Sequence, residues 1–157
     1  LKMLEDAVRE LRGEPVKWRL EPTIIEIGIP ALIPDTYIPS PYKLEIYRRL
    51  SLASTLEEVE DIGSELVDRF GKMPEEVENL LNVTIVKIFA EKRGIKKLSI
   101  TDDRVTVVFR DANGDGSILR ILGKFGQTKK INDENWIIRW WEDRNRKLIK
   151  IKEAIKP

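Results

Sequence analysis

Ile95-Lys-Lys-Leu-Ser-Ile-Thr101, then Asp102-Asp103, then Val105-Thr-Val-Val-Phe-Arg110 is the stretch that decides the fold class of this chain. Its two outer runs are short and rich in apolar and β-branched residues, which favours strands, and the aspartates between them favour a turn. Helical spacing dominates the chain before this stretch, whereas strands and helices are mixed after it. Because the elements come in blocks rather than in strict alternation, the sequence predicts an α+β fold, with an N-terminal helical part followed by a small mixed sheet with helices.

Three amphipathic helices are predicted before the stretch, between Pro41 and Gly94. Pro41 suits the first turn of a helix, Thr55 and Glu58 form a capping box for the second helix, and Gly71 provides its stop. The third helix opens with acidic residues and ends with basic ones, as the helix dipole favours. The side chains that we expect to face inward are Leu44, Tyr47, Leu50, Leu56, Val59, Ile62, Leu66, Phe70, Val77, Leu80, Leu81, Thr84, Ile88 and Phe89.

A proline-rich segment precedes these helices. Residues 30–41 contain four prolines, which exclude a helix and an internal strand. The segment also carries apolar residues such as Ile33 and Ile38, so we expect an extended segment held against the core. Upstream of it, the alternation from Thr23 to Ile29 predicts a strand, and the spacing from Met3 to Arg12 predicts a helix.

After the stretch, the sequence predicts further elements of both kinds. They are a loop over Asp111 to Gly116, a short helix over Ser117 to Phe125, a strand over Asn135 to Trp141 and a basic helix over Asp143 to Ile155. The change of character near Gly94 predicts two lobes, formed by residues 13–94 and 95–157.

Catalytic groups are scarce in this chain. It has no cysteine and no histidine, which removes thiol nucleophiles, disulfides, thiolate metal ligands and the usual general base near neutral pH. Gly123-Lys-Phe-Gly126 is too short for a phosphate-binding loop. No apolar run approaches the roughly 18 residues of a membrane span. We therefore predict a non-enzymatic, cytoplasmic interaction domain that binds no cofactor and no membrane.

One motif resembles a metal site. Asp111-Ala-Asn113-Gly-Asp115-Gly116 matches the first six positions of an EF-hand calcium loop. The twelfth position, which must supply a bidentate carboxylate, is Leu122. The preceding segment also favours a strand rather than the helix that an EF-hand requires. We therefore interpret the motif as a turn rich in Gly, Asn and Asp and predict no metal there.

The net charge of +1 hides two oppositely charged regions. Residues 55–79 hold nine acidic and two basic residues, whereas the last 38 residues, from Arg120 on, hold eleven basic and five acidic ones. On the acidic helix, Glu65, Asp68 and Arg69 are spaced i, i+3 and i+4 and share one patch. Asp61 extends the patch by one turn. This strip predicts contact with a basic partner, weakened by salt.

Nucleic-acid binding is the alternative interpretation of the basic region. A cluster of basic residues follows a cluster of tryptophans, and the residues are Arg144, Arg146, Lys147, Lys150, Trp136, Trp140 and Trp141. Basic patches with aromatic residues can bind phosphates and stack on bases. Tryptophans that fill the core and basic residues that solvate the helix are the competing explanation.

Several segments of the first hundred residues match a known family in order and spacing. They are Leu4-Glu-Asp-Ala-Val8, Glu26-Ile-Gly-Ile-Pro-Ala-Leu-Ile-Pro-Asp-Thr-Tyr-Ile-Pro39, Lys43-Leu-Glu-Ile-Tyr-Arg-Arg-Leu50, Glu65-Leu-Val-Asp-Arg-Phe-Gly71, Pro74 and Gly94-Ile-Lys-Lys-Leu98. Together they resemble the C-terminal domain of the bacterial transcription-repair coupling factor. Ser40 stands where the family often has an acidic residue, and after Thr101 the likeness is limited to the order of elements.

The resemblance implies a regulatory domain formed by residues 13–157, preceded by the tail of a translocase module in residues 1–12. The full-length family protein uses ATP to translocate on DNA, displaces stalled RNA polymerase and recruits the protein UvrA in nucleotide excision repair. Its terminal domain is similar to an autoinhibitory clamp that docks on an N-terminal UvrB-like module and covers the UvrA-binding surface. By this resemblance, the docking residues fall on Glu65, Asp68 and Arg69.

Overall fold

A computed structural model describes residues 21–112, 114 and 116–157 of the protein. The helix predicted over Met3 to Arg12 lies outside these residues. Within them the chain forms five helices and five strands. In chain order they are β1 (Ile24–Glu26), α2 (Ser40–Leu52), α3 (Leu56–Phe70), α4 (Glu75–Lys92), β2 (Ile95–Ile100), β3 (Arg104–Phe109), α5 (Gly116–Leu122), β4 (Gln127–Lys130), β5 (Asn135–Arg139) and α6 (Arg144–Ala154). The α+β class predicted from the sequence is confirmed.

The strands form one mixed sheet in the order β1-β2-β3-β5-β4. β1 runs parallel to β2, and every other neighbouring pair is antiparallel. The β2–β3 hairpin confirms the two strands and the turn expected from the sequence. β4 was not predicted, because Gln127 to Lys130 contains no apolar residue and lies at the edge of the sheet.

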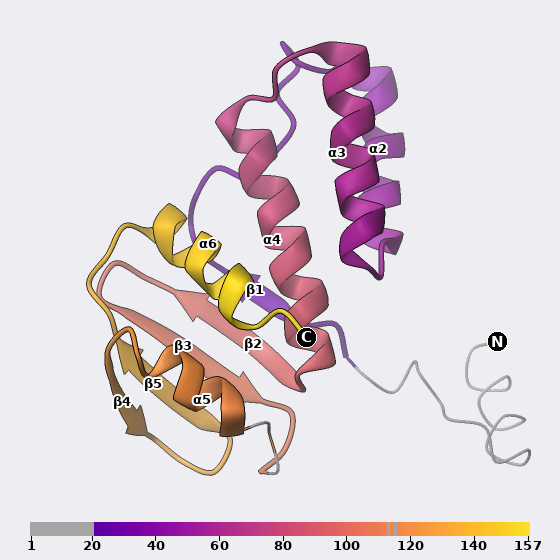
Figure 1. Cartoon of the computed structure of the whole chain (residues 1–157). Helices are drawn as coiled ribbons and strands as arrows, with labels where there is room; N and C mark the ends of the chain where they lie inside the picture. The colour runs from indigo at the N-terminus through magenta and orange to yellow at the C-terminus, as the bar shows by residue number, and fades with distance from the viewer. Residues whose placement is uncertain (1–20, 113, 115) are drawn as a thin grey trace, which may run out of the picture.

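The helices cover one face of this sheet (Figure 1). α4, α5 and α6 lie against it, while α2 and α3 pack on the far side of α4. The strand residues that face these helices are fully buried, including Leu98, Val107 and Ile138. Their neighbours along the strands, such as Thr106 and Ile137, are only half-buried. Because side chains alternate between the two faces of a strand, the second face of the sheet is open among the described residues.

α4 is buried on more sides than its sequence predicted. The expected inward residues Val77 and Ile88 are buried, and so are Ile85 and Val86. The reason is the position of α4 between the sheet on one side and α2 and α3 on the other. A helix with neighbours on opposite sides needs no single apolar stripe, so the spacing of one face underestimates its buried residues.

The ends of α3 follow their sequence signals. The Thr55 hydroxyl accepts a hydrogen bond from the Glu58 backbone N–H (3.2 Å). The Glu58 carboxylate reaches back one residue further than the capping box requires and accepts from Ser54 N–H (2.8 Å). Gly71 ends the helix with a φ of 84°, a conformation that favours glycine. The helix ends predicted from these residues are therefore confirmed.

α2 has a different buried face from the one predicted. Leu50 is buried and Tyr47 is half-buried, but Leu44 is 78% exposed and its predicted core position is wrong. Ile46 takes the buried place instead. Pro41 falls in the first turn, as expected.

The proline-rich segment is held against the core, as predicted. Ile33 and Ile38 are 2% and 0% exposed. Hydrogen bonds tie the segment to two helices, since Ile33 N–H donates to the Tyr47 hydroxyl (2.8 Å) and the Asn79 side-chain amide donates to the Pro30 carbonyl (2.9 Å). The strand before it, β1, is shorter than expected and has only three residues.

Several contacts join the regions on either side of Gly94. β1 pairs with β2, and α4 packs against β2 and α6. The division into lobes at this residue stays a prediction. Within the described residues, no helix is both long and apolar enough to cross a membrane.

Candidate partner-binding surface

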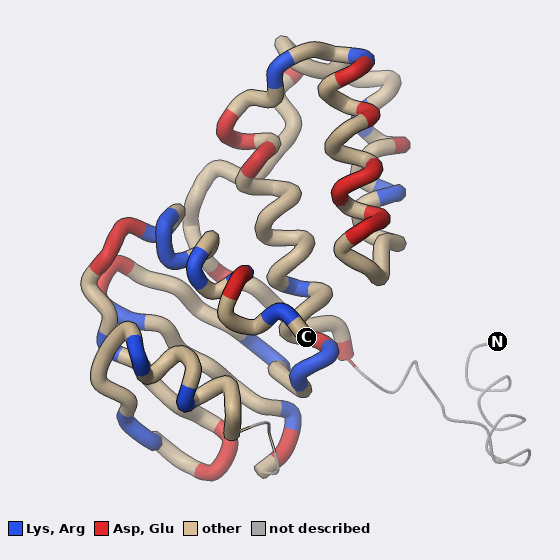
Figure 2. Tube along the Cα trace, viewed as in Figure 1, with Lys and Arg blue, Asp and Glu red and all other residues tan. Residues whose placement is uncertain are grey.

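α3 carries more acidic residues than any other helix of the described chain (Figure 2). Val59, Ile62 and Leu66 on its inner side are almost completely buried. The acidic residues on its outer side are exposed or half-buried, and they are Glu57, Glu58, Glu60, Asp61, Glu65 and Asp68. The buried face fixes how the helix is rotated, so the acidic face must point to solvent.

The four predicted residues Asp61, Glu65, Asp68 and Arg69, which we name the docking strip, all lie on this outer side. Glu65 is the best connected of them. Its carboxylate accepts a short hydrogen bond from Arg49 of α2 and lies 3.6 Å from the Arg69 guanidinium. Hydrogen bonding from Arg49 holds the pKa of Glu65 below its ordinary value, so Glu65 is ionised at neutral pH.

Asp61 and Asp68 are different, because they are exposed and neither has an ion-pair partner within the described part of the chain. Asp68 lines a shallow hollow on the α4 side together with Val67 and Met73. Asp61 lines a hollow on the α2 side. The docking strip therefore combines a paired centre at Glu65 with two free carboxylates, one on each flank.

Aromatic contacts fix the C-terminal end of α3. The Arg69 guanidinium lies 5.1 Å from the centre of the Phe70 ring, and Phe70 contacts Tyr37 with ring centres 5.9 Å apart. The Tyr37 hydroxyl donates to the Leu66 carbonyl (3.2 Å) or to the Gly71 carbonyl (2.9 Å). The proline-rich segment thus clamps the end of the helix that carries Asp68 and Arg69. The roles of Arg49 and Tyr37 could not be predicted from local spacing, because their partners lie 16 and 29 residues away.

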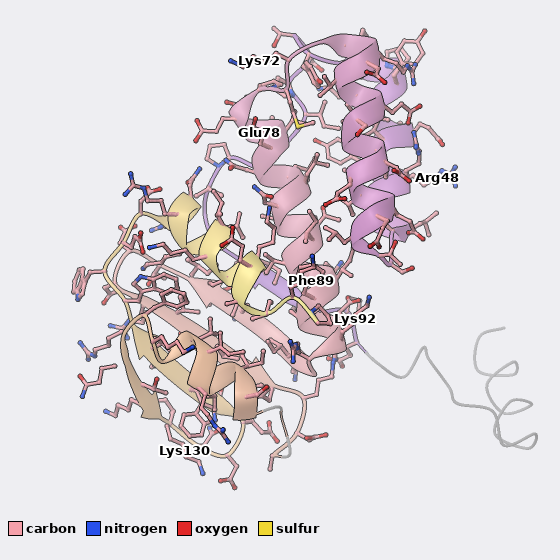
Figure 3. The ribbon with its side chains drawn as sticks, viewed as in Figure 1. Arg48, Lys72, Glu78, Phe89, Lys92 and Lys130 are labelled. Carbon is pink, nitrogen blue, oxygen red and sulfur yellow. The ribbon has the colours of Figure 1, made fainter. Side chains whose placement is uncertain are left out.

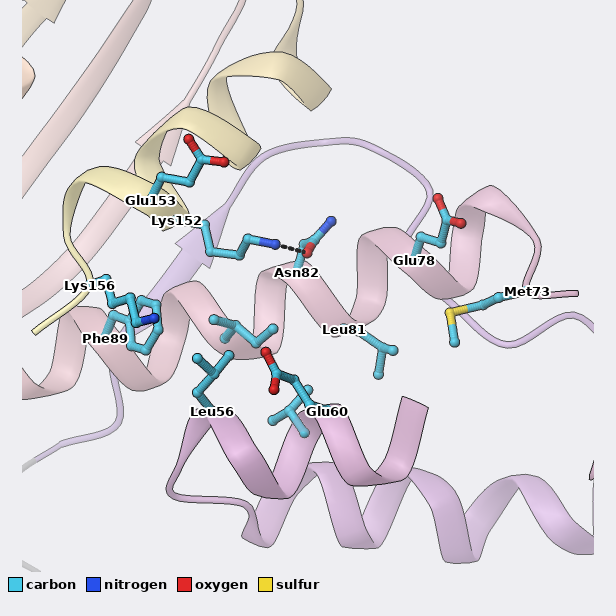
Figure 4. Close-up of a pocket in the computed structure, with 12 residues that line it drawn as sticks. Leu56, Glu60, Met73, Glu78, Leu81, Asn82, Phe89, Lys152, Glu153 and Lys156 are labelled. Carbon is cyan, nitrogen blue, oxygen red and sulfur yellow. Dashed lines mark hydrogen bonds between the residues drawn. The ribbon is translucent and has the colours of Figure 1, made fainter. Parts of the chain in front are cut away.

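A groove of about 440 Å³ runs beside α3, where it meets α4 and the end of α6 (Figure 4). Its floor is apolar and includes Leu56, Leu81 and Phe89. Charged side chains of both signs also line it, and they are Glu60, Glu78, Glu153, Lys152 and Lys156. The surface beside the docking strip therefore offers apolar contact area next to mixed charge.

The basic residues of α6 are mostly occupied inside the fold. Lys147 is fully buried, and its ammonium donates to the Thr101 carbonyl (2.6 Å) and the Asp102 carbonyl (2.9 Å). Burial lowers the pKa of Lys147 below its ordinary value. Lys150 donates to both carboxylate oxygens of Glu142 (2.7 and 2.9 Å).

Arg144 is also used internally, whereas Arg146 is not. The Arg144 guanidinium donates to Asp102 (2.8 Å) and to the Ile27 carbonyl (3.1 Å). Arg146 is exposed and has no ion-pair partner among the described residues. Only one of the four basic side chains predicted for nucleic-acid contact is therefore free on this helix.

The tryptophans before α6 also divide between core and surface. Trp140 is 5% exposed and stacks on Phe125 with ring centres 4.4 Å apart. Trp136 is half-buried, and Lys130 lies 5.7 Å from its ring centre. Trp141 is 76% exposed. Trp140 therefore fills the core, as one of the two explanations expected, whereas Trp141 does not.

The calcium-like motif has two positions, Asn113 and Asp115, outside the described residues. Leu122 at its twelfth position is fully buried in the core. Across residues 21–112, 114 and 116–157, no group of three or more acidic side chains could hold a metal ion. The interpretation of this motif as a turn stays a prediction.

Comparison with known proteins places the chain in a class by its fold. A crystal structure of the C-terminal domain of a transcription-repair coupling factor superposes with a TM-score of 0.69 and 22% identity, over 85% of this chain and 91% of that one. The chain is therefore an α+β domain with the fold of that terminal domain.

The sequence matches name the family. A family model described as the TRCF domain matches residues 27–117, more than half of the chain, so the chain belongs to this family. The transcription-repair-coupling factor of Myxococcus xanthus is 39% identical over 117 residues, which is 73% of this chain and 10% of that protein. That of Escherichia coli K12 is 35% identical over 118 residues, or 72% of this chain and 10% of that protein. The chain thus spans about a tenth of the length of these relatives.

Proposed function

We propose that this chain is a non-catalytic regulatory domain of a transcription-repair coupling factor. Its docking strip binds the UvrB-like module at the N-terminus of the same protein and covers the surface that UvrA recognises. The parent protein is then an ATP-dependent DNA translocase of the bacterial cytoplasm, which displaces stalled RNA polymerase and brings UvrA to the site. Release of the docked domain exposes the UvrA-binding surface.

The observation that carries this proposal is the pair of free carboxylates on a rigid helix. Asp61 and Asp68 are exposed without partners among the described residues, while Glu65 between them is fixed by Arg49. A partner with basic side chains satisfies these carboxylates without first breaking contacts of this chain. Such an arrangement favours fast, salt-sensitive association with a basic surface.

The contacts of the basic helix α6 argue against a partner at that helix. Lys147, Lys150 and Arg144 already bind groups of this domain, so the large positive charge of the C-terminal region is not free for a partner on α6. The acidic helix, by contrast, has charge to offer. The difference in unpaired charge between the two helices favours a basic protein partner at α3 over a phosphate partner at α6.

The energy that such a clamp needs is small. A tenfold masking of UvrA binding requires about 1.4 kcal/mol of preference for the docked state. Exposed salt bridges contribute about 0.2–1 kcal/mol each, so two or three of them together reach this energy. The salt bridges of the docking strip can therefore supply the energy that a reversible switch needs.

The test uses the full-length parent protein and purified UvrA in a pull-down. The triple variant Glu65→Lys, Asp68→Lys, Arg69→Glu is expected to capture at least about tenfold more UvrA, the factor that corresponds to 1.4 kcal/mol. The matched control is Glu45→Lys with Arg48→Glu, which reverses an exposed ion pair of α2. Arg48 points into solvent away from α3 (Figure 3). Equal UvrA capture by wild type and triple variant refutes the proposal, and so does an equal gain in the control.

A further inference from the structure

The open face of the sheet carries a line of positive charge that the docking function does not use. Arg104 of β3, Arg139 of β5 and Lys129 of β4 all point to this face, and we name them the sheet stripe. Arg104 and Arg139 are direct cross-strand partners, and Lys129 pairs with Ile137, two residues from Arg139. Their neighbours Val105 and Ile138 are completely buried, which places the stripe on the face without helices.

Like charges directly opposite each other on a sheet destabilise it. Arg104 is partly compensated, because its guanidinium donates to the Asp103 carboxylate (2.9 Å). Arg139 and Lys129 are exposed, and neither has an ion-pair partner within the described ranges. Glu26 of β1, on the same face, is paired with Lys97 (3.2 Å). The stripe therefore keeps uncompensated positive charge that an anion can satisfy.

An exposed indole follows the stripe in the loop between β5 and α6. The chain runs on from β5 beside β3, since the backbone N–H of Trp140 donates to the Asp103 carbonyl (2.9 Å). Trp141 follows Arg139 by two residues, which is the spacing of side chains on one face of an extended strand. Its ring is 76% exposed, whereas the preceding Trp140 is buried in the core. Large exposed aromatic rings beside cations are typical of surfaces that bind unpaired bases.

We propose that the sheet stripe and Trp141 bind single-stranded DNA. Arg139, Lys129 and Arg104 contact the backbone phosphates, and the Trp141 indole stacks on a base. A base in a duplex is covered by its neighbours, so the exposed indole favours a single strand. The choice of DNA over RNA rests on the proposed function, in which the parent protein acts on DNA.

This surface is separate from the docking strip. The stripe lies on the face of the sheet opposite α4, and α3 lies on the far side of α4. Binding of DNA and docking of the UvrB-like module therefore use different residues. The proposal also relocates the nucleic-acid contact expected on α6, where three of the four basic residues are occupied.

The test measures binding of the 157-residue chain to a fluorescein-labelled oligo(dT) of about 20 nucleotides by anisotropy, across a salt series. For single strands the slope of log affinity against log salt is about −0.7 for each phosphate contacted. Wild type is expected to bind with a slope between about −1.4, from Arg139 and Lys129 alone, and about −2, if Arg104 exchanges Asp103 for a phosphate. Arg139→Gln with Lys129→Gln is expected to flatten the slope to no steeper than about −0.7 and to lower affinity roughly tenfold at low salt.

Trp141→Ala tests the stacking contact separately. It is expected to lower affinity about fivefold or more without changing the salt slope, because stacking carries no charge. The matched charge control is Arg146→Gln, an exposed basic residue of α6, which is expected to leave the affinity within twofold. Circular dichroism checks that each variant is folded. If Arg139→Gln disturbs the sheet, Lys129→Gln and Trp141→Ala carry the test, since both side chains are exposed.

Four results overturn the proposal. They are no binding by wild type at low salt, equal loss in Arg146→Gln, tighter binding to duplex DNA than to the single strand, and tighter binding to oligo(U) than to oligo(dT). A preference for duplex DNA would mean that the stripe binds phosphates without stacking on a base. A preference for oligo(U) would mean that the partner is RNA. None of these results bears on the UvrA pull-down, which is decided by residues of α3.

Discussion

α3 and α6 are both rich in charge, but they use it in opposite ways. The acids of α3 lie on an exposed face, and Asp61 and Asp68 have no ion-pair partner among the described residues. Most cations of α6 are bound within the domain, with Arg146 as the exception, and Lys147 is buried completely. The difference shows that a run of charge in a sequence marks either a surface for a partner or a set of internal contacts. The groups that each charged atom reaches decide between the two.

The largest effect on stability is expected at Lys147. Lys147→Ala removes a buried side chain and leaves the Thr101 and Asp102 carbonyls without their donor, so we expect a loss of about 3 kcal/mol in the free energy of unfolding. Urea denaturation followed by circular dichroism measures it. The matched control Arg146→Ala, an exposed residue of the same helix, is expected to change stability by less than about 0.5 kcal/mol. Similar losses in the two variants would show that Lys147 is a solvated surface residue.

An intermediate effect is expected at Arg144. Arg144→Ala removes hydrogen bonds to the Ile27 carbonyl and to Asp102, for an expected loss of about 1–2 kcal/mol. Asp102 is 79% exposed, so its ion pair with Arg144 should contribute less than about 1 kcal/mol. A double-mutant cycle with Asp102→Ala separates the two contributions. A coupling energy equal to the whole loss would mean that the surface ion pair, and not the tie to Ile27, holds this helix.

The smallest effect is a pH dependence at Glu65. Its pKa is lowered by hydrogen bonding from Arg49, so its contribution to stability is present above the unfolded value of about 4.5 and is lost as pH falls through the lower folded value. Wild type should therefore exceed Glu65→Gln in urea midpoint at pH 6 to 7, and the difference should shrink below about pH 4.5. The control Asp68→Asn, which removes no ion pair of the described structure, should show no such trend. A constant difference from pH 3 to 7 would exclude the ionic contact as its cause.

Much of the fold was predictable because its signals are local. The cap at Thr55, the stop at Gly71 and the β2–β3 hairpin depend on residues within a few positions of each other. The elements missed depend on distant partners. β4 has no apolar residue and forms only because β5 supplies backbone hydrogen bonds, and Leu44 of α2 is exposed because the packing partners of that helix lie on its other side.

The same distinction applies to the candidate sites. Helical spacing alone placed Glu65, Asp68 and Arg69 on one exposed face of α3. It could not show that Arg49 of the neighbouring helix binds Glu65. Nor could it show that Lys147 is buried, since lysine is almost always exposed unless its charge is paired. The open face of the sheet became visible only once the strand order and register were known.

The most direct test of the docking surface is calorimetry of this chain titrated with the separate UvrB-like module of its parent protein. Wild type is expected to bind with an affinity that falls as salt rises, because the contact is between unlike charges. The triple variant Glu65→Lys, Asp68→Lys, Arg69→Glu is expected to bind at least about tenfold more weakly, a change of about 1.4 kcal/mol. Binding of equal strength by wild type and triple variant, or no binding by wild type at low salt, would contradict a docking role for α3.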